Sequence, residues 1–293
     1  MEVGTIILAI SLIIIMFGMG LSLVKADFLR IIERPKAIII GLINQIILLP
    51  LIAYALIVLF KVDAAIAIGI MILAACPGGP TSNLITHLAK GDIGLSVSLT
   101  AVNSLVTVFT IPFIVDFALK HFLDAGQVIE LDKLKTILQV FVIVIIPVAI
   151  GMWIKNLKPN FAKKMQRPVK IASAAVLFAV IIILVLKQKE DLIPYLKQAG
   201  LIALVLNVVT MLLGYLSAKL LRLNLSQSIT IAIESGIQNG TMALAIALGI
   251  LMNESFAIAP AVYSLIMFLT GGLVIGLGLS TSSPPEKAQD ETS

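Results

Sequence analysis

The sequence predicts an all-α polytopic membrane protein with about nine transmembrane helices, and three observations support this. Of the 293 residues, 59% are hydrophobic, and the mean hydropathy is +1.10. Soluble domains are about 45–50% apolar. Charge-free apolar runs recur along the whole chain, and most reach the roughly 20 residues that a helix needs to cross a bilayer. Two of these runs are interrupted by polar and helix-breaking residues, at 76–83 and at 233–240.

The apolar runs define one membrane domain, 1–280, followed by a tail. The tail, 281–293, is rich in Ser, Pro and charged residues, a composition typical of disorder. The sequence predicts membrane helices over 4–24, 37–60, 64–90, 92–122, 134–157, 170–187, 198–220, 223–253 and 255–280.

The distribution of basic residues predicts the orientation. With the N-terminus outside, fourteen of the 21 Lys and Arg residues fall in inner loops, whereas the opposite orientation reverses the ratio. Cytoplasmic loops are enriched in Lys and Arg, so we expect a multi-pass protein of the cell (inner) membrane with a cytoplasmic C-terminus. The same effect explains the basic surplus without a nucleic-acid partner. Met1-Glu-Val-Gly lacks a basic signal-peptide region, so the first run is expected to be a retained helix.

The two interruptions predict an inverted repeat. The first is Cys76-Pro-Gly-Gly-Pro-Thr-Ser-Asn83, and the second is Ile233-Glu-Ser-Gly-Ile-Gln-Asn-Gly240. They lie in predicted helices that are five apart, so equivalent helices cross the membrane in opposite directions. Paired broken helices of this kind are typical of a transporter with a binding site near the bilayer midplane.

The polar residues around the interruptions point to a monovalent cation. Glu234 is the carboxylate placed deepest in a predicted helix, and such a group is costly in a membrane unless it has a task. Every other candidate ligand is a neutral oxygen, which suits a hard monovalent cation better than Ca²⁺ or Mg²⁺. These candidates are Asn44, Gln45, Ser82, Asn83, Ser96, Thr100 and Gln238, with the freed carbonyls of Ser235 and Ile237.

The sequence offers no support for an intramembrane enzyme. It lacks a pair of facing aspartates, a His-Glu-x-x-His motif and a serine with a nearby histidine, and His87 and His121 are isolated at the ends of predicted helices. Its single cysteine, Cys76, excludes an internal disulfide and a Cys/His metal site. A protein that is not an enzyme is therefore expected.

At these residues the chain resembles the bacterial branch of the bile acid:sodium symporter family, over essentially its whole length. The segments that carry the resemblance are Ile15-Ile-Met-Phe-Gly-Met-Gly-Leu-Ser-Leu23, Arg34-Pro-Lys36, Cys76–Asn83, Leu88-Ala-Lys-Gly-Asp-Ile-Gly-Leu-Ser-Val97 and Glu234-Ser-Gly-Ile-Gln-Asn239. The resemblance implies two discontinuous helices that cross in a core domain, beside a smaller panel domain. The panel would contain 4–24, 134–157 and 170–187, and the remaining predicted helices would form the core.

The resemblance also implies the function and the site residues. The protein would be a secondary active transporter that carries a bile-acid-like anion or small carboxylate with two Na⁺ ions by alternating access. The first sodium site would contain Ser82, Asn83, Ser96, Thr100 and Glu234. The second would contain Gln45, Glu234, Ser235, Ile237 and Gln238. The substrate would meet Pro80, Thr81, Asn239 and Phe268.

Two departures from the family pattern and two alternatives remain. The family normally has ten helices, whereas nine are predicted here. Pro80 stands where some relatives have a hydroxyl, and a His-Asn pair of one branch is missing near Phe268. Glu234 could instead carry a proton, giving a proton-coupled organic anion transporter, or the protein could be a membrane sensor or binding protein. Substrate identity, ion stoichiometry and oligomeric state stay open.

Overall fold

The computed structural model describes residues 3–33, 35–123, 131–187 and 192–280. Within them the chain forms helices, with no strand and one isolated backbone bridge. The all-α fold is thereby confirmed. The predicted tail, 281–293, lies outside the described residues, as does Arg34.

The helices follow one another in an order close to the predicted one. In the first half these are α1 (Val3–Gly20), α2 (Lys25–Glu33), α3 (Pro35–Leu42), η1 (Ile43–Leu48), α4 (Leu49–Phe60), α5 (Ala64–Ala75), α6 (Pro80–Leu88) and α7 (Ile93–Phe122). The second half contains α8 (Lys133–Val140), η2 (Phe141–Ile145), α9 (Ile146–Leu157), α10 (Pro159–Lys187), α11 (Leu192–Leu220), α12 (Leu225–Gly236), α13 (Gly240–Ala245), η3 (Ile246–Ile250), η4 (Ser255–Ala257) and α14 (Ile258–Ser280).

Several helix boundaries differ from the predicted ones; the first helix, for example, ends at Gly20 and not at residue 24. A short helix, α2, follows α1 where a loop was predicted, and it is strongly amphipathic. The helices α10 and α11 begin at Pro159 and Leu192, earlier than the predicted starts at 170 and 198. In each of these segments, charged residues that were predicted to be loop are helical. A charged residue shows where a helix leaves the apolar part of the bilayer, but the helix can continue beyond it.

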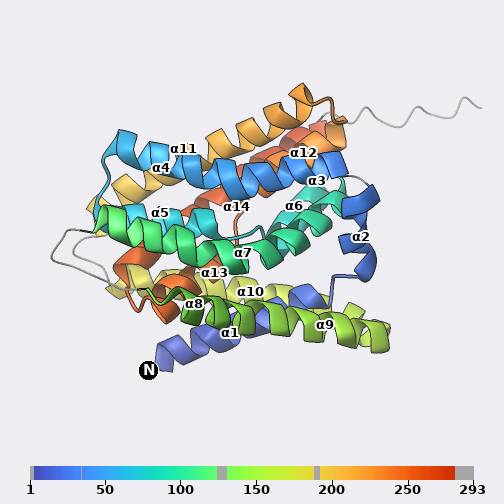
Figure 1. The fold of residues 1–293 in the computed structure, drawn as a ribbon, viewed down its shortest axis with the longest axis horizontal. Helices are drawn as coiled ribbons and strands as arrows, with labels where there is room; N and C mark the ends of the chain where they lie inside the picture. The colour runs from blue at the N-terminus through green and yellow to red at the C-terminus, as the bar shows by residue number, and fades with distance from the viewer. Residues whose placement is uncertain (1–2, 34, 124–130, 188–191, 281–293) are drawn as a thin grey trace, which may run out of the picture.

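Five described helices are individually long and apolar enough to cross a membrane: Pro35–Phe60, Ile93–Phe122, Lys133–Leu157, Lys197–Leu220 and Ser255–Leu277. Each predicted broken helix is divided into two shorter helices, α5 and α6 in the first half of the chain and α12 and α13 in the second. None of these four helices is long enough to cross a membrane alone. Figure 1 shows that the two broken pairs run in opposite directions and that their breaks lie in the middle of the molecule. This is the arrangement expected of inverted repeats.

Two of the long helices contain a π-helical turn just before a proline. The turn η1 precedes Pro50, and η2 precedes Pro147. Because a proline ring clashes with the carbonyl four residues earlier, the helix accommodates it by a local change of winding. The turn η1 matters for the site, because it contains the adjacent buried residues Asn44 and Gln45.

The helices form two layers. Helices α1, α8, α9 and α10, here called the small layer, lie together along one side in Figure 1. Helix α1 packs on both α9 and α10. The remaining long helices form the large layer, in which α11 packs on α12 and α14, and α5 packs on α4, α7 and α14.

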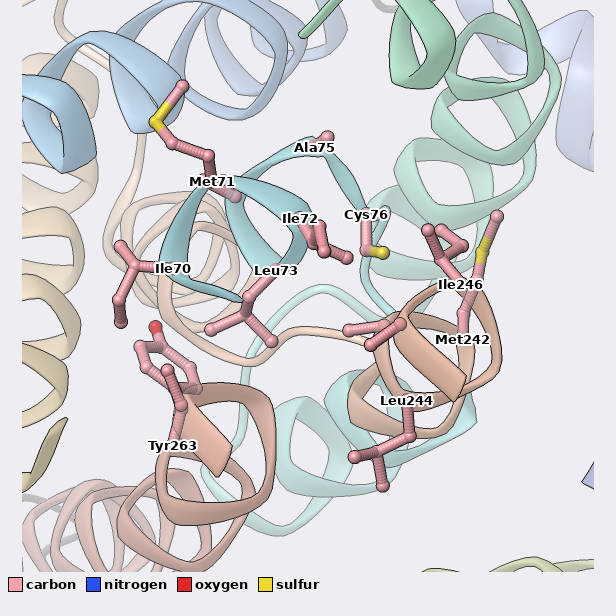
Figure 2. Close-up of a cluster of buried hydrophobic side chains, with 14 of the residues drawn as sticks. Ile70, Met71, Ile72, Leu73, Ala75, Cys76, Met242, Leu244, Ile246 and Tyr263 are labelled. Carbon is pink, nitrogen blue, oxygen red and sulfur yellow. The ribbon is translucent and has the colours of Figure 1, made fainter. Parts of the chain in front are cut away.

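The centre of the large layer is apolar around α5, which is buried on all sides from Ile66 to Ala75. Figure 2 shows Tyr263 beside Ile70 and Leu73 of α5, and Cys76, which follows α5, facing Ile246 and Met242 of the α13 region. A helix that is apolar all round is expected to be buried in this way. This packing holds the two broken helices against each other.

Candidate cation and anion sites at the helix crossing

The two helix breaks contact each other through their backbones. Helix α5 ends at Cys76, which is extended because Pro77 follows it, and α12 ends at Gly236 before an extended Ile237. An antiparallel bridge joins Gly78 to Gln238, and the backbone N–H of Asn239 donates to the carbonyl of Pro77 at 2.9 Å. The backbone groups that leave their own helices therefore pair partly across the crossing.

Gly78 allows the Glu234 carboxylate to approach this crossing. A Cβ atom at position 78 would lie 2.8 Å from Glu234 Oε2 and 3.2 Å from Ser82 Oγ. The carboxylate thus occupies space that a side chain at position 78 would fill. A residue other than glycine requires the carboxylate to move.

The first cluster of oxygens surrounds the Glu234 side chain. Ser96 Oγ donates to Glu234 Oε1 at 2.5 Å, and Thr100 Oγ1 donates to Glu234 Oε2 at 3.0 Å. Asn83 Oδ1 lies 2.7 Å from Ser96 Oγ and 3.4 Å from Thr100 Oγ1. The Ser82 hydroxyl contacts the same carboxylate and donates to the carbonyl of Gly79 at 2.8 Å. All five residues predicted for the first sodium site are therefore together.

Helix α7 directs two of these side chains toward Glu234, and the whole cluster is buried. Ser96 and Thr100 are one turn apart on α7, so they point the same way. Both are fully buried, as is Ser82, and Glu234 is 5% exposed. Hydroxyl groups hold this buried carboxylate, and no Lys or Arg side chain among the described residues forms an ion pair with it. A buried negative charge without a basic partner has the electrostatics of a cation site.

The second cluster lies on the backbone side of Glu234. One atom of the Gln45 amide is 2.8 Å from the backbone oxygen of Glu234, and the other is 2.6 Å from Gln238 Oε1. Gln238 Nε2 in turn donates to the carbonyl of Ser235 at 2.9 Å. The carbonyl of Ile237 lies 3.6 Å from the position of a Cβ at Gly78. The residues predicted for the second sodium site are thus also neighbours.

One orientation of the Gln45 amide finds partners on both of its atoms. Its nitrogen then donates to the Glu234 carbonyl oxygen at 2.8 Å, and its oxygen accepts from the backbone N–H of Gly78 at 3.2 Å. In this orientation the Gln45 oxygen also lies 2.6 Å from Gln238 Oε1. Two neutral amide oxygens that face each other repel, and a hard cation bound between them would remove that repulsion.

Two residues of the crossing were not predicted from the sequence. Asn207 Nδ2 donates to the freed carbonyl of Gly236 at 2.8 Å, and Tyr263 OH donates to the same oxygen at 2.8 Å. Both side chains are fully buried. Asn207 is an amide in an apolar run and could have been noticed for that reason, whereas nothing in the sequence distinguishes Tyr263 from other buried aromatics.

On the other side of the crossing lies a cavity of about 160 Å³ between the two layers. Its lining includes α1 residues, Gln166 of α10 and residues of the large layer. All four residues predicted to meet the substrate line it: Pro80, Thr81, Asn239 and Phe268.

Asn239 has a free donor at this cavity. Its Oδ1 accepts from the backbone N–H of Met242 at 3.0 Å and so caps α13. Its Nδ2 is buried and has no hydrogen-bond partner among the described residues. Helix α6 also begins at this cavity, and a helix N-terminus favours negative charge. An anion with hydrogen-bond acceptors fits these groups.

Comparison with known proteins confirms the predicted family. A family model described as the sodium bile acid symporter family matches residues 9–195. An uncharacterized sodium-dependent transporter of Bacillus subtilis, YocS, is 32% identical over 91% of this chain and 81% of its own length. The human ileal sodium/bile acid cotransporter is 30% identical over 92% of this chain and 78% of its own length. A probable sodium/metabolite cotransporter of Arabidopsis thaliana chloroplasts, BASS1, is 27% identical over 96% and 68%.

Proposed function

Because this chain belongs to the sodium bile acid symporter family, we propose that it is a secondary active transporter that carries an organic anion together with Na⁺. The family and the relatives are transporters, not enzymes. The observation that carries the proposal is the convergence of hydroxyl, amide and carbonyl oxygens on Glu234 at the crossing of two broken helices.

Two Na⁺ ions would share Glu234. One would bind Ser82, Asn83, Ser96, Thr100 and the carboxylate, and the other would bind Gln45, Gln238 and the carbonyls of the second break. The close approach of the Gln45 and Gln238 amide oxygens supports the second position, and the close hydroxyls of Ser96 and Thr100 support the first. Two cations on one carboxylate leave positive charge in a medium of low dielectric.

That positive charge couples sodium to the substrate. A bile-acid-like anion or small carboxylate in the cavity at Asn239 would offset it, and its binding would then strengthen that of sodium. Sodium would also order the two breaks that present Pro80, Thr81 and Asn239 to the cavity. Each ligand would raise the affinity of the other, as linkage requires.

Movement of the large layer against the small layer would carry the substrate across the membrane. The cavity between the two layers supports this proposal. In these terms the small layer is the panel and the large layer is the core. The N-terminus would lie outside and the C-terminus in the cytoplasm of a cell whose inner membrane holds the protein.

The proposal is tested by thermal stability in detergent, with NaCl titrated against KCl at constant ionic strength. Binding to the folded state alone adds about 2.7 kcal/mol at a hundredfold excess over Kd. We expect a Na⁺-specific rise in Tm that Glu234→Gln abolishes. A matched control is Asp116→Asn, which removes another buried helix carboxylate but one paired with Lys120 at 3.1 Å and Lys133 at 2.8 Å. It should keep the Na⁺ response.

Equal stability in NaCl and KCl for the wild-type protein would contradict sodium coupling. In that case a pH titration of the wild type and Glu234→Gln would test the proton-coupled alternative. With a sodium response in hand, a screen of organic anions in saturating Na⁺ for a further rise in Tm would identify the substrate class.

A further inference from the structure

Polar side chains continue beyond the Glu234 cluster toward the turn between α6 and α7. Thr230 lies one helical turn before Glu234 on α12, and Thr86 lies one turn after Ser82 on α6. Residues four apart share a helix face, so both threonines extend faces that already line the cluster. Both are fully buried.

The hydroxyl of Thr86 is the unusual group in this region. Buried hydroxyls on these helices commonly donate to the carbonyl four residues earlier, as Ser98 does to Gly94 at 2.8 Å and Ser264 does to Pro260 at 2.7 Å. Thr86 Oγ1 is buried and has no hydrogen-bond partner among the described residues. A buried polar atom without a permanent partner indicates water or an ion at that position.

Gly91 brings the two threonines together. A Cβ at position 91 would lie 2.7 Å from Thr230 Oγ1 and 2.7 Å from Thr86 Cγ2, so both side chains reach the same point. Thr230 Oγ1 accepts from the backbone N–H of Asp92 at 2.7 Å and donates to the carbonyl of Ser226 at 2.9 Å. The oxygen of Thr230 therefore keeps a lone pair, and the methyl group of Thr86 lies near it across Gly91, on the same side chain as the unpaired Oγ1.

This pair of threonines lies between the buried cluster and the surface. Gly91 and Asp92 are half-buried, whereas Thr86 and Thr230 are fully buried. Thr86 is in the last turn of α6, where the carbonyl end of the helix favours a cation. The Asp92 carboxylate adds negative charge at the surface, although Arg30 also lies there, close to Gly94.

Resting on the function proposed above, we propose that Thr86 and Thr230 form a transfer site through which Na⁺ passes between Glu234 and the aqueous phase at the α6–α7 turn. This route is separate from the anion cavity, whose lining includes Thr81 and Leu84 of α6 but neither threonine of the pair, nor Gly91. Na⁺ would move from the hydroxyl oxygens of Ser82 and Ser96 to those of the threonines, one helical turn away. The ion could then leave while the anion stays in place.

The test separates the rate of sodium movement from its equilibrium binding. Thr86→Val keeps the shape of the side chain and removes the oxygen, and Thr86→Ser restores the hydroxyl. Thr270→Val is the control, because Thr270 is also buried but its hydroxyl bonds to the carbonyl of Ile266 at 3.2 Å. Equilibrium binding is measured as the Na⁺-dependent rise in Tm. The rate of sodium movement is measured as the decay of the transient current after a Na⁺ concentration jump on proteoliposomes adsorbed to a solid support.

We expect Thr86→Val to slow the current decay about tenfold, because Na⁺ would lose one oxygen ligand at the energy barrier for its movement. The Na⁺ dependence of Tm should be unchanged. Thr86→Ser and Thr270→Val should decay at the wild-type rate. Gly91→Ala should also slow the decay, since its Cβ would lie between the threonines, whereas Gly94→Ala meets the flexible Arg30 at 3.3 Å and should have no effect.

A wild-type decay rate in Thr86→Val would overturn the transfer site. Loss of the Na⁺-dependent rise in Tm in Thr86→Val would also overturn it, because Thr86 would then belong to the binding site itself. Absence of any sodium response in the wild-type protein would instead refute the proposed function, so the two failures are distinguishable.

Discussion

At the scale of single residues, the site depends on how closely Glu234 approaches the first helix break. Ser96 and Thr100 hold the two carboxylate oxygens from one side, and Gly78 leaves room for them on the other. The carboxylate is thus held between one face of α7 and the backbone at Gly78, which has no side chain. Such a group can bind a cation without first rearranging, which lowers the cost of binding.

The role of Gly78 leads to a testable prediction. In Gly78→Ala the new methyl group would lie 2.8 Å from Glu234 Oε2, so the carboxylate or the break must shift. Overpacking of this kind costs about 1–3 kcal/mol. We expect a lower Tm and loss of the Na⁺-specific rise in Tm, measured in the NaCl against KCl titration.

The neighbouring glycine provides the matched control. A Cβ at Gly79 would approach no closer than 3.6 Å to its neighbours, an ordinary contact, and its φ of −140° suits any residue. Gly79→Ala should keep the Na⁺ response. If both alanine variants respond to Na⁺ as the wild type does, close approach at Gly78 is not required for sodium binding.

At the scale of elements, the broken helices are stabilised by what replaces their missing hydrogen bonds. The carbonyl of Gly236, freed at the end of α12, accepts from both Asn207 and Tyr263. The start of α13 is capped by Asn239, and the breaks share a backbone hydrogen bond between Asn239 and Pro77. Because the bonds from Asn207, Tyr263 and Pro77 come from other parts of the fold, the breaks depend on the folded core as well as on their own helices.

The cap of α13 can be tested by substitution. Asn239→Ala removes the bond to Met242 and should lower the unfolding free energy by about 1 kcal/mol. Asn239→Asp keeps an acceptor in the same place and should retain most of that stability. The measurement is Tm in detergent without sodium.

A second cap gives the comparison for this experiment. Asn224 caps α12 together with Gln227, at an exposed position far from the cavity lining, and Asn224→Ala should cost a similar amount. Equal loss of stability in Asn239→Ala and Asn239→Asp would mean that the cap is not what Asn239 contributes.

Asn239→Asp also places a negative charge at the cavity. It should therefore weaken any rise in Tm that an organic anion produces in saturating Na⁺.

At the scale of the whole molecule, the two layers meet at the cavity and at several contacts between helices, including those of α7 with α8 and η2. One of these is a stacked pair of rings, Phe178 of α10 and Phe268 of α14, with centroids 6.0 Å apart. Helices α1 and α10 also touch α13, which follows the second break. Movement of one layer against the other must change these contacts and with them the shape of the cavity.

Cross-linking the layers should therefore stop transport without stopping sodium binding. The single cysteine, Cys76, is buried, and Cys76→Ala gives a background free of thiols. In that background, Phe178→Cys with Phe268→Cys can be joined by a short reducible bifunctional thiol reagent. We expect Na⁺-driven uptake of the anion to fall to the level of empty liposomes and to return on reduction, with the Na⁺-dependent rise in Tm retained.

The two single-cysteine proteins, treated with the same reagent, are the controls and should transport as before treatment. Full uptake by the cross-linked protein would contradict a mechanism in which the layers move against each other at this contact. Loss of the sodium response would show that the cross-link disturbs the ion sites.

The sequence by itself determined the membrane class, the two helix breaks and the residues that stand next to them. Each follows from local chemistry: apolar runs match the thickness of a bilayer, Pro77 lies in the first break, Gly236 and Gly240 flank the second, and Glu234 is too costly to bury without a task. The neighbours of Glu234 within one helix turn, Ser235 and Gln238, could be named for the same reason.

The tertiary structure alone decided which distant groups share the crossing. Asn207 and Tyr263 hold the Gly236 carbonyl, Gly78 lies under the carboxylate, and the unpaired Thr86 meets Thr230 at Gly91. These contacts join α6, α11, α12 and α14. Of these helices, α11 and α14 pack on α5, whereas α12 packs on α11 and α6 packs on α12 and α14, so their relative rotation is set by the packing of many apolar side chains. Packing of that kind depends on the shapes of all the surrounding side chains together, which no local pattern of residues encodes.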